Sequence, residues 1–181
     1  MRCFVGCWLP APVRDHLAAT LDGLRPWPTS LRRVDPERWH LTLAFLGDVE
    51  LDELDRAHRA LAEVSERHAP VTGLTLAGAG IFGAVLWIGL PDVERGHPLD
   101  RLARDVQRSM RAVRIPVERR PWRPHVTVAR SRGSAYPRST ARLLERYAGP
   151  EWGIAEFALV ESQTGPLPSY TELERWRITG E

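Results

Sequence analysis

Apolar residues in the first half of the chain follow two spacings, one typical of strands and one typical of helices. Residues 2–8 and 40–46 are short, nearly continuous apolar runs, which predict buried β-strands. Residues 12–24 and 51–67 carry apolar side chains three and four positions apart, which predicts helices with one buried face. A further strand is predicted near residues 71–77. The predicted order is therefore strand, helix, strand, helix, strand.

The second half repeats this order about 85 residues later. Strands are predicted over 84–90, 125–131 and 154–162, helices over 98–114 and 138–148, and a last strand over 170–179. A plan used twice predicts one pseudo-symmetric, two-lobed domain over residues 1–181. We expect lobes of roughly 1–80 and 81–181 with a boundary near Gly78–Gly83, and the terminal strands either stay in their own lobe or are exchanged between lobes.

Two of the predicted strands contain a histidine and a threonine two positions apart. "HLTLAF" begins at His40 and "HVTVAR" begins at His125. Because residues i and i+2 of a strand share a face, Thr42 should lie beside His40 and Thr127 beside His125. A single histidine in an apolar strand is usually structural, but two such pairs at equivalent places in a repeated plan indicate one shared site.

The chemistry of such a site follows from its four side chains. Two imidazoles with pKa values near 6.5 can act as one acid and one base near neutral pH. A hydroxyl beside each ring can donate to a bound anion, which suits in-line displacement at phosphorus. Zinc is the alternative, but the motifs contain no carboxylate or cysteine to complete its three or four ligands. We therefore expect no metal and no cofactor.

The paired motifs resemble those of the two-histidine phosphoesterases. The contexts "WHLTLAFLGDV" and "WRPHVTVAR", the opening "RCFVGCWLPAPVRDHL" and the ending "FALVESQTGPLPSYTELERW" look like the bacterial and archaeal RNA 2′,3′-cyclic phosphodiesterases, formerly called 2′-5′ RNA ligases. The resemblance spans essentially the whole chain. It implies an α+β fold with two mainly antiparallel sheets, flanked by helices, around a central cleft.

The resemblance also implies a reaction and a role for each motif residue. The reaction is metal-independent hydrolysis of RNA 2′,3′-cyclic phosphates to 2′-phosphomonoesters, and the same displacement by an RNA hydroxyl would join RNA ends through a 2′-5′ linkage. His40 would be the proton donor to the leaving 3′ oxygen and His125 the proton acceptor that activates water. Thr42 and Thr127 would hold the phosphate. The sequence alone does not separate the two histidine roles.

Residues around the motifs are candidates for substrate binding. Arg130 resembles the arginine that ends the family's second motif, although strict strand alternation places it on the face opposite His125. Its counterpart in the first half, Phe45, would either stack on a base or lie in the core. The family's S-x-L element stands here as "ESQTGPLPSY", a departure that gives no firm basis for binding by Ser162 or Tyr170.

Composition changes this picture little. The net charge of +2 is too small to indicate nucleic-acid binding by itself, and all 25 basic residues are arginine. Arginines that precede the motifs would line an RNA path or a solvated surface: Arg32, Arg33, Arg38, Arg119, Arg120 and Arg123. The histidines without a threonine partner should lie at the surface or cap helices: His16, His58, His68 and His97. Cys3 and Cys7 would be about 13 Å apart on one strand, too far for a disulfide, and should be buried.

The remaining features limit the class of protein. No apolar run approaches the roughly 20 residues that span a bilayer, and no signal peptide is recognisable, so we expect a cytoplasmic protein without a membrane partner. Separately, we expect a monomer. Its expected partners are RNA ends or nucleotides with a 2′,3′-cyclic phosphate. Two alternatives stay open: a phosphoesterase for a small cyclic phosphate such as an ADP-ribose derivative, and a non-catalytic module that binds RNA ends.

Overall fold

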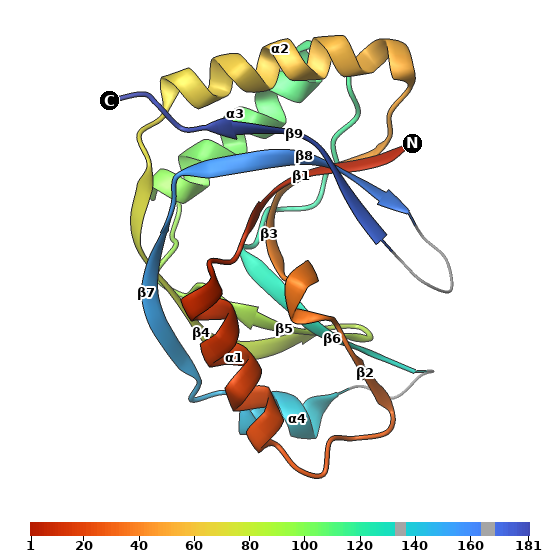
Figure 1. The fold of residues 1–181 in the computed structure, drawn as a ribbon, viewed down its shortest axis with the longest axis vertical. Helices are drawn as coiled ribbons and strands as arrows, with labels where there is room; N and C mark the ends of the chain where they lie inside the picture. The colour runs from red at the N-terminus through yellow and green to blue at the C-terminus, as the bar shows by residue number, and fades with distance from the viewer. Residues whose placement is uncertain (133–136, 164–168) are drawn as a thin grey trace.

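Strands that are distant in the sequence lie side by side in the computed structural model, which describes residues 1–132, 137–163 and 169–181 (Figure 1). The strands are β1 (Arg2–Trp8), β2 (Leu31–Arg33), β3 (His40–Asp48), β4 (Val71–Phe82), β5 (Val85–Gly89), β6 (His125–Ser131), β7 (Ala148–Ile154), β8 (Glu156–Gln163) and β9 (Ser169–Arg177). The helices are α1 (Ala11–Gly23), α2 (Leu51–Arg67), α3 (Pro98–Ala112) and α4 (Arg138–Leu143), with a 3-10 turn at Pro36–Arg38. Within these described ranges, no helix has the length and apolar character needed to cross a membrane.

The strands form one antiparallel sheet in the order β7-β4-β5-β6-β3-β1-β8-β9, and β2 also pairs with β6, along the edge away from β5. Its two halves meet at a single bridge between Leu41 of β3 and Val126 of β6. We call β1, β3, β8 and β9 the upper lobe and β2 and β4–β7 the lower lobe. The predicted α+β fold is confirmed. The two expected sheets are joined at this bridge into one sheet of nine strands.

Neither lobe is a continuous half of the chain. The β4–β5 hairpin, which contains Gly78–Gly83, pairs within the lower lobe, whereas β8 pairs with β1 and β9 with β8 in the upper lobe. Each lobe likewise takes one helix or more from each half of the chain. In the lower lobe α1 packs against β7 and α4 against β4; in the upper lobe α3 packs against β3 and α2 against β9 (Figure 1).

Most elements lie where the apolar spacing predicts them, and the helix over 51–67 matches to the residue. The helix predicted over 138–148 is wrong beyond Leu143, because Gly149 and Pro150 do not continue a helix and Ala148–Ile154 pairs with β4 instead. The strand predicted over 71–77 continues to Phe82 as one arm of the hairpin. The three-residue strand β2 carries no periodic signal, so apolar spacing does not predict it.

The four remaining histidines have structural partners. His97 caps α3 by accepting the N–H of Leu99 at 3.1 Å, as predicted, and His16 is exposed beside Tyr147. His58 and His68 are partly buried and bind carboxylates rather than solvent.

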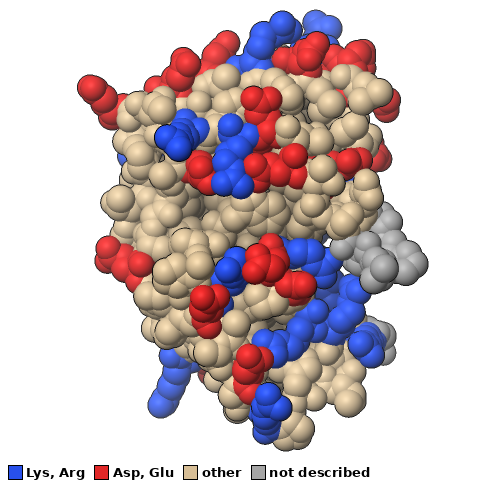
Figure 2. All heavy atoms as spheres, viewed as in Figure 1, with Lys and Arg blue, Asp and Glu red and all other residues tan. Residues whose placement is uncertain are grey.

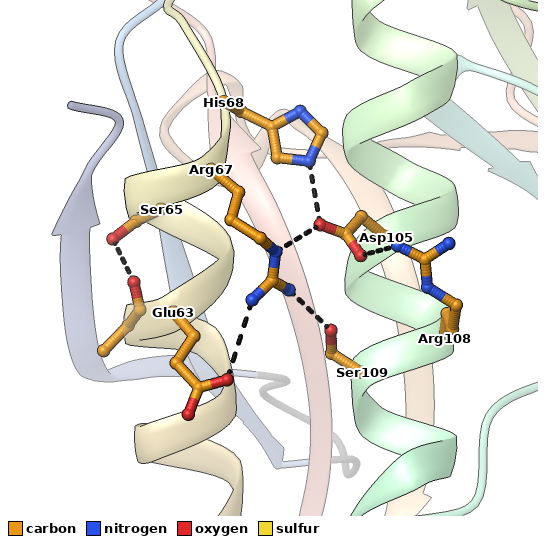
Figure 3. Close-up of polar contacts among 8 residues, drawn as sticks. Glu63, Ser65, Arg67, His68, Asp105, Arg108 and Ser109 are labelled. Atoms are coloured by element: carbon orange, nitrogen blue, oxygen red, sulfur yellow. Dashed lines mark hydrogen bonds and ion pairs between the residues drawn. The ribbon is translucent and has the colours of Figure 1, made fainter. Parts of the chain in front are cut away.

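A buried carboxylate joins α2 to α3 (Figure 3). Asp105 of α3 is 6% exposed and accepts hydrogen bonds from Arg67 at 3.1 Å, His68 at 2.9 Å and Arg108 at 2.6 Å. Burial alone raises the pKa of Asp105, but the three donors outweigh it and hold this pKa below its ordinary value. The carboxylate is therefore buried at little cost, because its charge is paired.

Replacing Asp105 with Ala should lower the free energy of unfolding by about 2 kcal/mol, since hydrogen bonds to a charged group are lost. The melting temperature should fall by roughly 4–8 °C. The pKa of the Asp105 carboxyl is lower in the folded protein than its ordinary value of 3.8. The group therefore stabilises the fold fully at pH values above 3.8, and this stabilisation is lost as the pH falls through the folded pKa. The difference between wild type and Asp105→Asn in urea titrations should therefore persist at neutral pH and close in acid. Glu63→Gln, at the exposed end of the network, is the control and should change little.

Candidate active site

The two His-x-Thr strands lie next to each other at the centre of the sheet. His40 and Thr42 of β3 and His125 and Thr127 of β6 all line one cavity of about 360 Å³. The apolar residues between them point the other way, and the Leu41–Val126 bridge itself is fully buried. The sheet thus brings the four side chains of the two motifs into a common cavity.

Both imidazole rings are oriented by the same backbone contact. Nδ1 of His40 lies 2.8 Å from the carbonyl oxygen of Arg38, and Nδ1 of His125 lies 2.8 Å from that of Arg123. A carbonyl oxygen only accepts, so Nδ1 carries the hydrogen in each neutral ring. This leaves Nε2 of both histidines free to exchange protons with a bound substrate.

Aromatic rings surround His40. The Phe4 ring stacks on it at a centroid distance of 4.5 Å, and Trp8 and Tyr170 approach edge-on at 5.6 and 5.2 Å. These rings restrict the orientation of the imidazole and remove much of its contact with water.

His125 has a smaller aromatic environment in the lower lobe. Phe82 meets its ring edge-on at 5.2 Å, and Trp87 lies at 6.2 Å. A Cβ atom at Gly80 would come within 2.1 Å of the Trp87 ring, so this position of the indole requires a glycine opposite it.

Burial makes both histidines weak bases. It lowers the pKa of His40 to about 4; the hydrogen bond to the Arg38 carbonyl opposes this, and the positive charges of His125 and Arg130 add to it. The pKa of His125 is lowered as well, chiefly by burial and further by Arg130, against the hydrogen bond to Arg123. Both rings are therefore neutral at pH 7 when no anion is bound.

A β-bulge places Arg130 in the cavity. Where β5 advances by one residue, β6 advances by two. The two residues at this point, Val128 and Ala129, are both fully buried. Alternation is thereby shifted by one, and Arg130 emerges on the face of His125 and Thr127, where it lines the cavity. Strict alternation, which would place Arg130 opposite His125, therefore does not hold at this point of β6.

The same irregularity occurs at the equivalent place in β3. The register with β1 passes from Thr42 to Ala44 while β1 moves by one residue, and Leu43 and Ala44 are both buried. Phe45 consequently turns to the cavity and is 43% exposed. Of its two predicted placements, the core is wrong, and the ring is accessible for stacking.

Donors other than the paired strands at each bulge hydrogen-bond the carbonyl oxygens there. The indole of Trp122 donates to the carbonyl of Thr42 at 2.9 Å, and the amide of Gln107 donates to that of Leu43 at 3.0 Å. In the lower lobe, the N–H of Val34 donates to the carbonyl of Val128 at 2.9 Å. Both bulges thus keep their hydrogen bonds, as buried backbone groups require.

The cavity lining is strongly basic. Four arginines contribute to it: Arg2, Arg32, Arg38 and Arg130. Among the described residues that line the cavity, there is no carboxylate. Figure 2 shows basic side chains gathered where Figure 1 places β2 and the end of β6. A lining of this kind favours an anion.

The other predicted arginines are divided between different surroundings. Arg120 and Arg123 line an adjoining cavity of about 540 Å³ that shares Thr42 and His125 with the first. Arg33 binds Asp22 at 2.6 Å, and Arg119 lines neither cavity.

Comparison with known proteins identifies the family. The family model described as "2'-5' RNA ligase superfamily" matches residues 12–166. This chain belongs to the 2′-5′ RNA ligase superfamily. It is 33% identical to a protein of Thermus thermophilus named RNA 2′,3′-cyclic phosphodiesterase, over 100% of this chain and 92% of that protein.

Solved structures of similar proteins share the fold of this superfamily member. The crystal structure of TT0787 of Thermus thermophilus has a TM-score of 0.82 and 31% identity, with both chains fully covered. Escherichia coli LigT, in a crystal structure complexed with 3′-AMP, has a TM-score of 0.78 and 28% identity over 98% of each chain.

The sequence offers no firm basis for two further lining residues. Ser162 and Tyr170 are paired across β8 and β9, and both face the cavity. Because the S-x-L pattern expected from the resemblance is altered here, only their place in the cavity lining reveals them. Among the described residues, no group of three or more His, Cys, Asp or Glu side chains is placed to hold a metal ion.

Titration of the histidines tests this description of the cavity. In the empty protein the His40 resonances should titrate near pH 4, well below the ordinary value of 6.5. Inorganic phosphate should raise this pKa by about one unit or more, because a nearby anion favours the imidazolium form. NMR of ring ¹⁵N nuclei, assigned with His40→Gln and His125→Gln, gives the measurement. A His40 that titrates near 6.5 without phosphate would contradict the burial of the ring.

Proposed function

We propose that this chain is an RNA 2′,3′-cyclic phosphodiesterase that forms 2′-phosphomonoesters by acid–base catalysis with His40 and His125. The observation that carries the proposal is the pair of free Nε2 atoms, one from each lobe, that face one basic cavity beside two threonine hydroxyls. The relatives named RNA 2′,3′-cyclic phosphodiesterase support an RNA cyclic phosphate over the ADP-ribose alternative.

Binding the anion prepares the site for the reaction. The hydroxyls of Thr42 and Thr127 donate to the non-bridging oxygens of the phosphate, and the guanidinium of Arg130 offsets its charge. This negative charge raises the pKa of His40, so the bound substrate favours protonation of Nε2 and the imidazolium form. The crystal structure of LigT complexed with 3′-AMP supports a nucleotide as the occupant.

The displacement then needs one proton transfer at each end. Nε2 of His125 takes a proton from water as the water oxygen attacks phosphorus in line with the 3′ oxygen. The P–O3′ bond breaks, and Nε2–H of His40 protonates the departing oxygen. The product is a 2′-phosphomonoester with a free 3′ hydroxyl. An RNA 5′ hydroxyl in place of water would give a 2′-5′ linkage by the same steps.

We also propose that the protein works as a monomer in the cytoplasm without a metal. All groups of the mechanism come from one chain. The proton transfers are assigned to the histidines, so no step needs a Lewis acid.

The histidine roles can be tested with adenosine 2′,3′-cyclic phosphate. His40→Ala and His125→Ala should each lower kcat by about 10²–10⁴-fold, the usual value of one general acid or base. The exposed His16→Ala is the control and should retain wild-type turnover, as should wild type treated with EDTA. Product identity is read by chromatography against both monoesters. Formation of the 3′-monoester would contradict the assigned orientation, and activity restored only by zinc would contradict the metal-free mechanism.

The pH dependence follows from the lowered pKa values. kcat/KM reports the free enzyme, where burial lowers the pKa values of both His40 and His125 below 6.5. Its bell-shaped profile should therefore have its maximum and its alkaline limb below pH 6.5. Stopped assays in buffers of constant ionic strength give the profile. An alkaline limb above pH 7 would show that these two groups do not control the free enzyme.

A further inference from the structure

Two arginines face each other across neighbouring strands at one corner of the cavity. Arg32 of β2 is directly opposite Arg130 of β6, and opposed residues of antiparallel strands project to the same face. Both side chains are exposed and line the cavity. In the part of the chain that the structure describes, no carboxylate contacts either guanidinium.

This arrangement is unfavourable in the empty protein. Like charges directly opposite in a sheet destabilise it, so the pair is expected only where an anion offsets the repulsion. The strand is nevertheless held in this register from its other face. Arg33 binds Asp22 at 2.6 Å and lies over the Trp27 ring at 5.2 Å, which leaves Arg32 directed to the cavity.

The pseudo-symmetry of the fold supplies a comparison. The positions 85 residues from Arg130 and Arg32 are Phe45 and Val117, and both line the adjoining cavity. The N–H of Glu118 donates to the Phe45 carbonyl at 3.0 Å, so this segment runs beside β3 as β2 runs beside β6. Two apolar side chains, Phe45 and Val117, thus stand where the equivalent positions carry two cations, which is more charge than the single reacting phosphate requires.

We propose that Arg32 binds the phosphate on the 5′ side of the reacting nucleoside, so that the cleft selects the cyclic end of an RNA chain over a cyclic mononucleotide. This inference rests on the proposed function. Arg130 emerges beside His125 and Thr127 and serves the reacting phosphate. Arg32 lies one strand spacing of about 4.8 Å farther out. The next anion along an RNA chain is the phosphate on O5′ of the same ribose, and a guanidinium binds it with two parallel hydrogen bonds.

The position of β2 allows the rest of the chain to leave the site. β2 pairs on one side with β6, and basic side chains gather at the surface in Figure 2 where Figure 1 places β2. Nucleotides upstream of the bound phosphate would continue into solvent past this edge.

A pair of substrates isolates the charge of that phosphate. Both are ribodinucleotides that end in a 2′,3′-cyclic phosphate; one has the natural phosphodiester linkage, and the other has a neutral methylphosphonate linkage. Wild type should hydrolyse the natural dinucleotide with a kcat/KM about tenfold higher. Arg32→Gln should reduce this ratio to about one, because its kcat/KM should fall about tenfold more for the natural dinucleotide than for the neutral one. For the natural dinucleotide, the slope of log kcat/KM against log salt concentration should also be less steep for Arg32→Gln than for wild type, by about 0.7.

The matched control is Arg33→Gln, which removes the same charge from the neighbouring position of β2 but on the opposite face. It should keep the tenfold preference, and thermal melting checks that both variants are folded. The proposal is overturned if Arg32→Gln retains the preference, or if Arg33→Gln loses it equally, which would assign the effect to net charge. Failure of the proposed function has a different signature, since wild type would then hydrolyse neither dinucleotide.

Discussion

The bridge between Leu41 and Val126 determines the geometry of this protein more than any other contact. It is the single paired position between the two halves of the sheet, and it lies between the histidine and the threonine of both motifs. Strand alternation then sends the two flanking side chains of each strand to the opposite face, so both pairs point into one cavity. Because the bridging residues are fully buried, moving the two strands apart would expose the core as well as separate the histidines.

Burial beside the Leu41–Val126 bridge fixes the position of His40 but weakens it as a base. The aromatic rings that fix His40 also remove its water, which lowers its pKa to about 4 and leaves it neutral in the empty protein. The cavity lining adds positive charge and, among its described residues, no carboxylate. A bound anion would therefore raise the histidine pKa values that burial lowers. Asp105 shows the alternative solution, in which three permanent donors pair a buried charge and the result is stability rather than reactivity.

Apolar spacing was sufficient to predict most elements and the four motif residues, because a period of two or of three to four reports directly on burial. It failed where the period is interrupted. Val128 and Ala129 are both apolar, so their sequence does not show that both point inward, and the placement of Arg130 depended on that point. Ser162 and Tyr170 reach the cavity only through the pairing of β8 and β9 in the other lobe, a long-range contact that no local pattern encodes.

The repeat provides a symmetric frame, and its sequence differences give the cleft a direction. Equivalent backbone contacts orient both histidines, and equivalent bulges turn the residues at 45 and 130 inward. One of these residues is phenylalanine and the other is arginine, and His40 is more enclosed by aromatic rings than His125. An RNA end is itself directional, with a base on one side of the ribose and a phosphate chain on the other. Under the proposed function, a cleft with phenylalanine at one of these positions and arginine at the other would bind it in one orientation, and that orientation would decide which histidine meets the leaving oxygen.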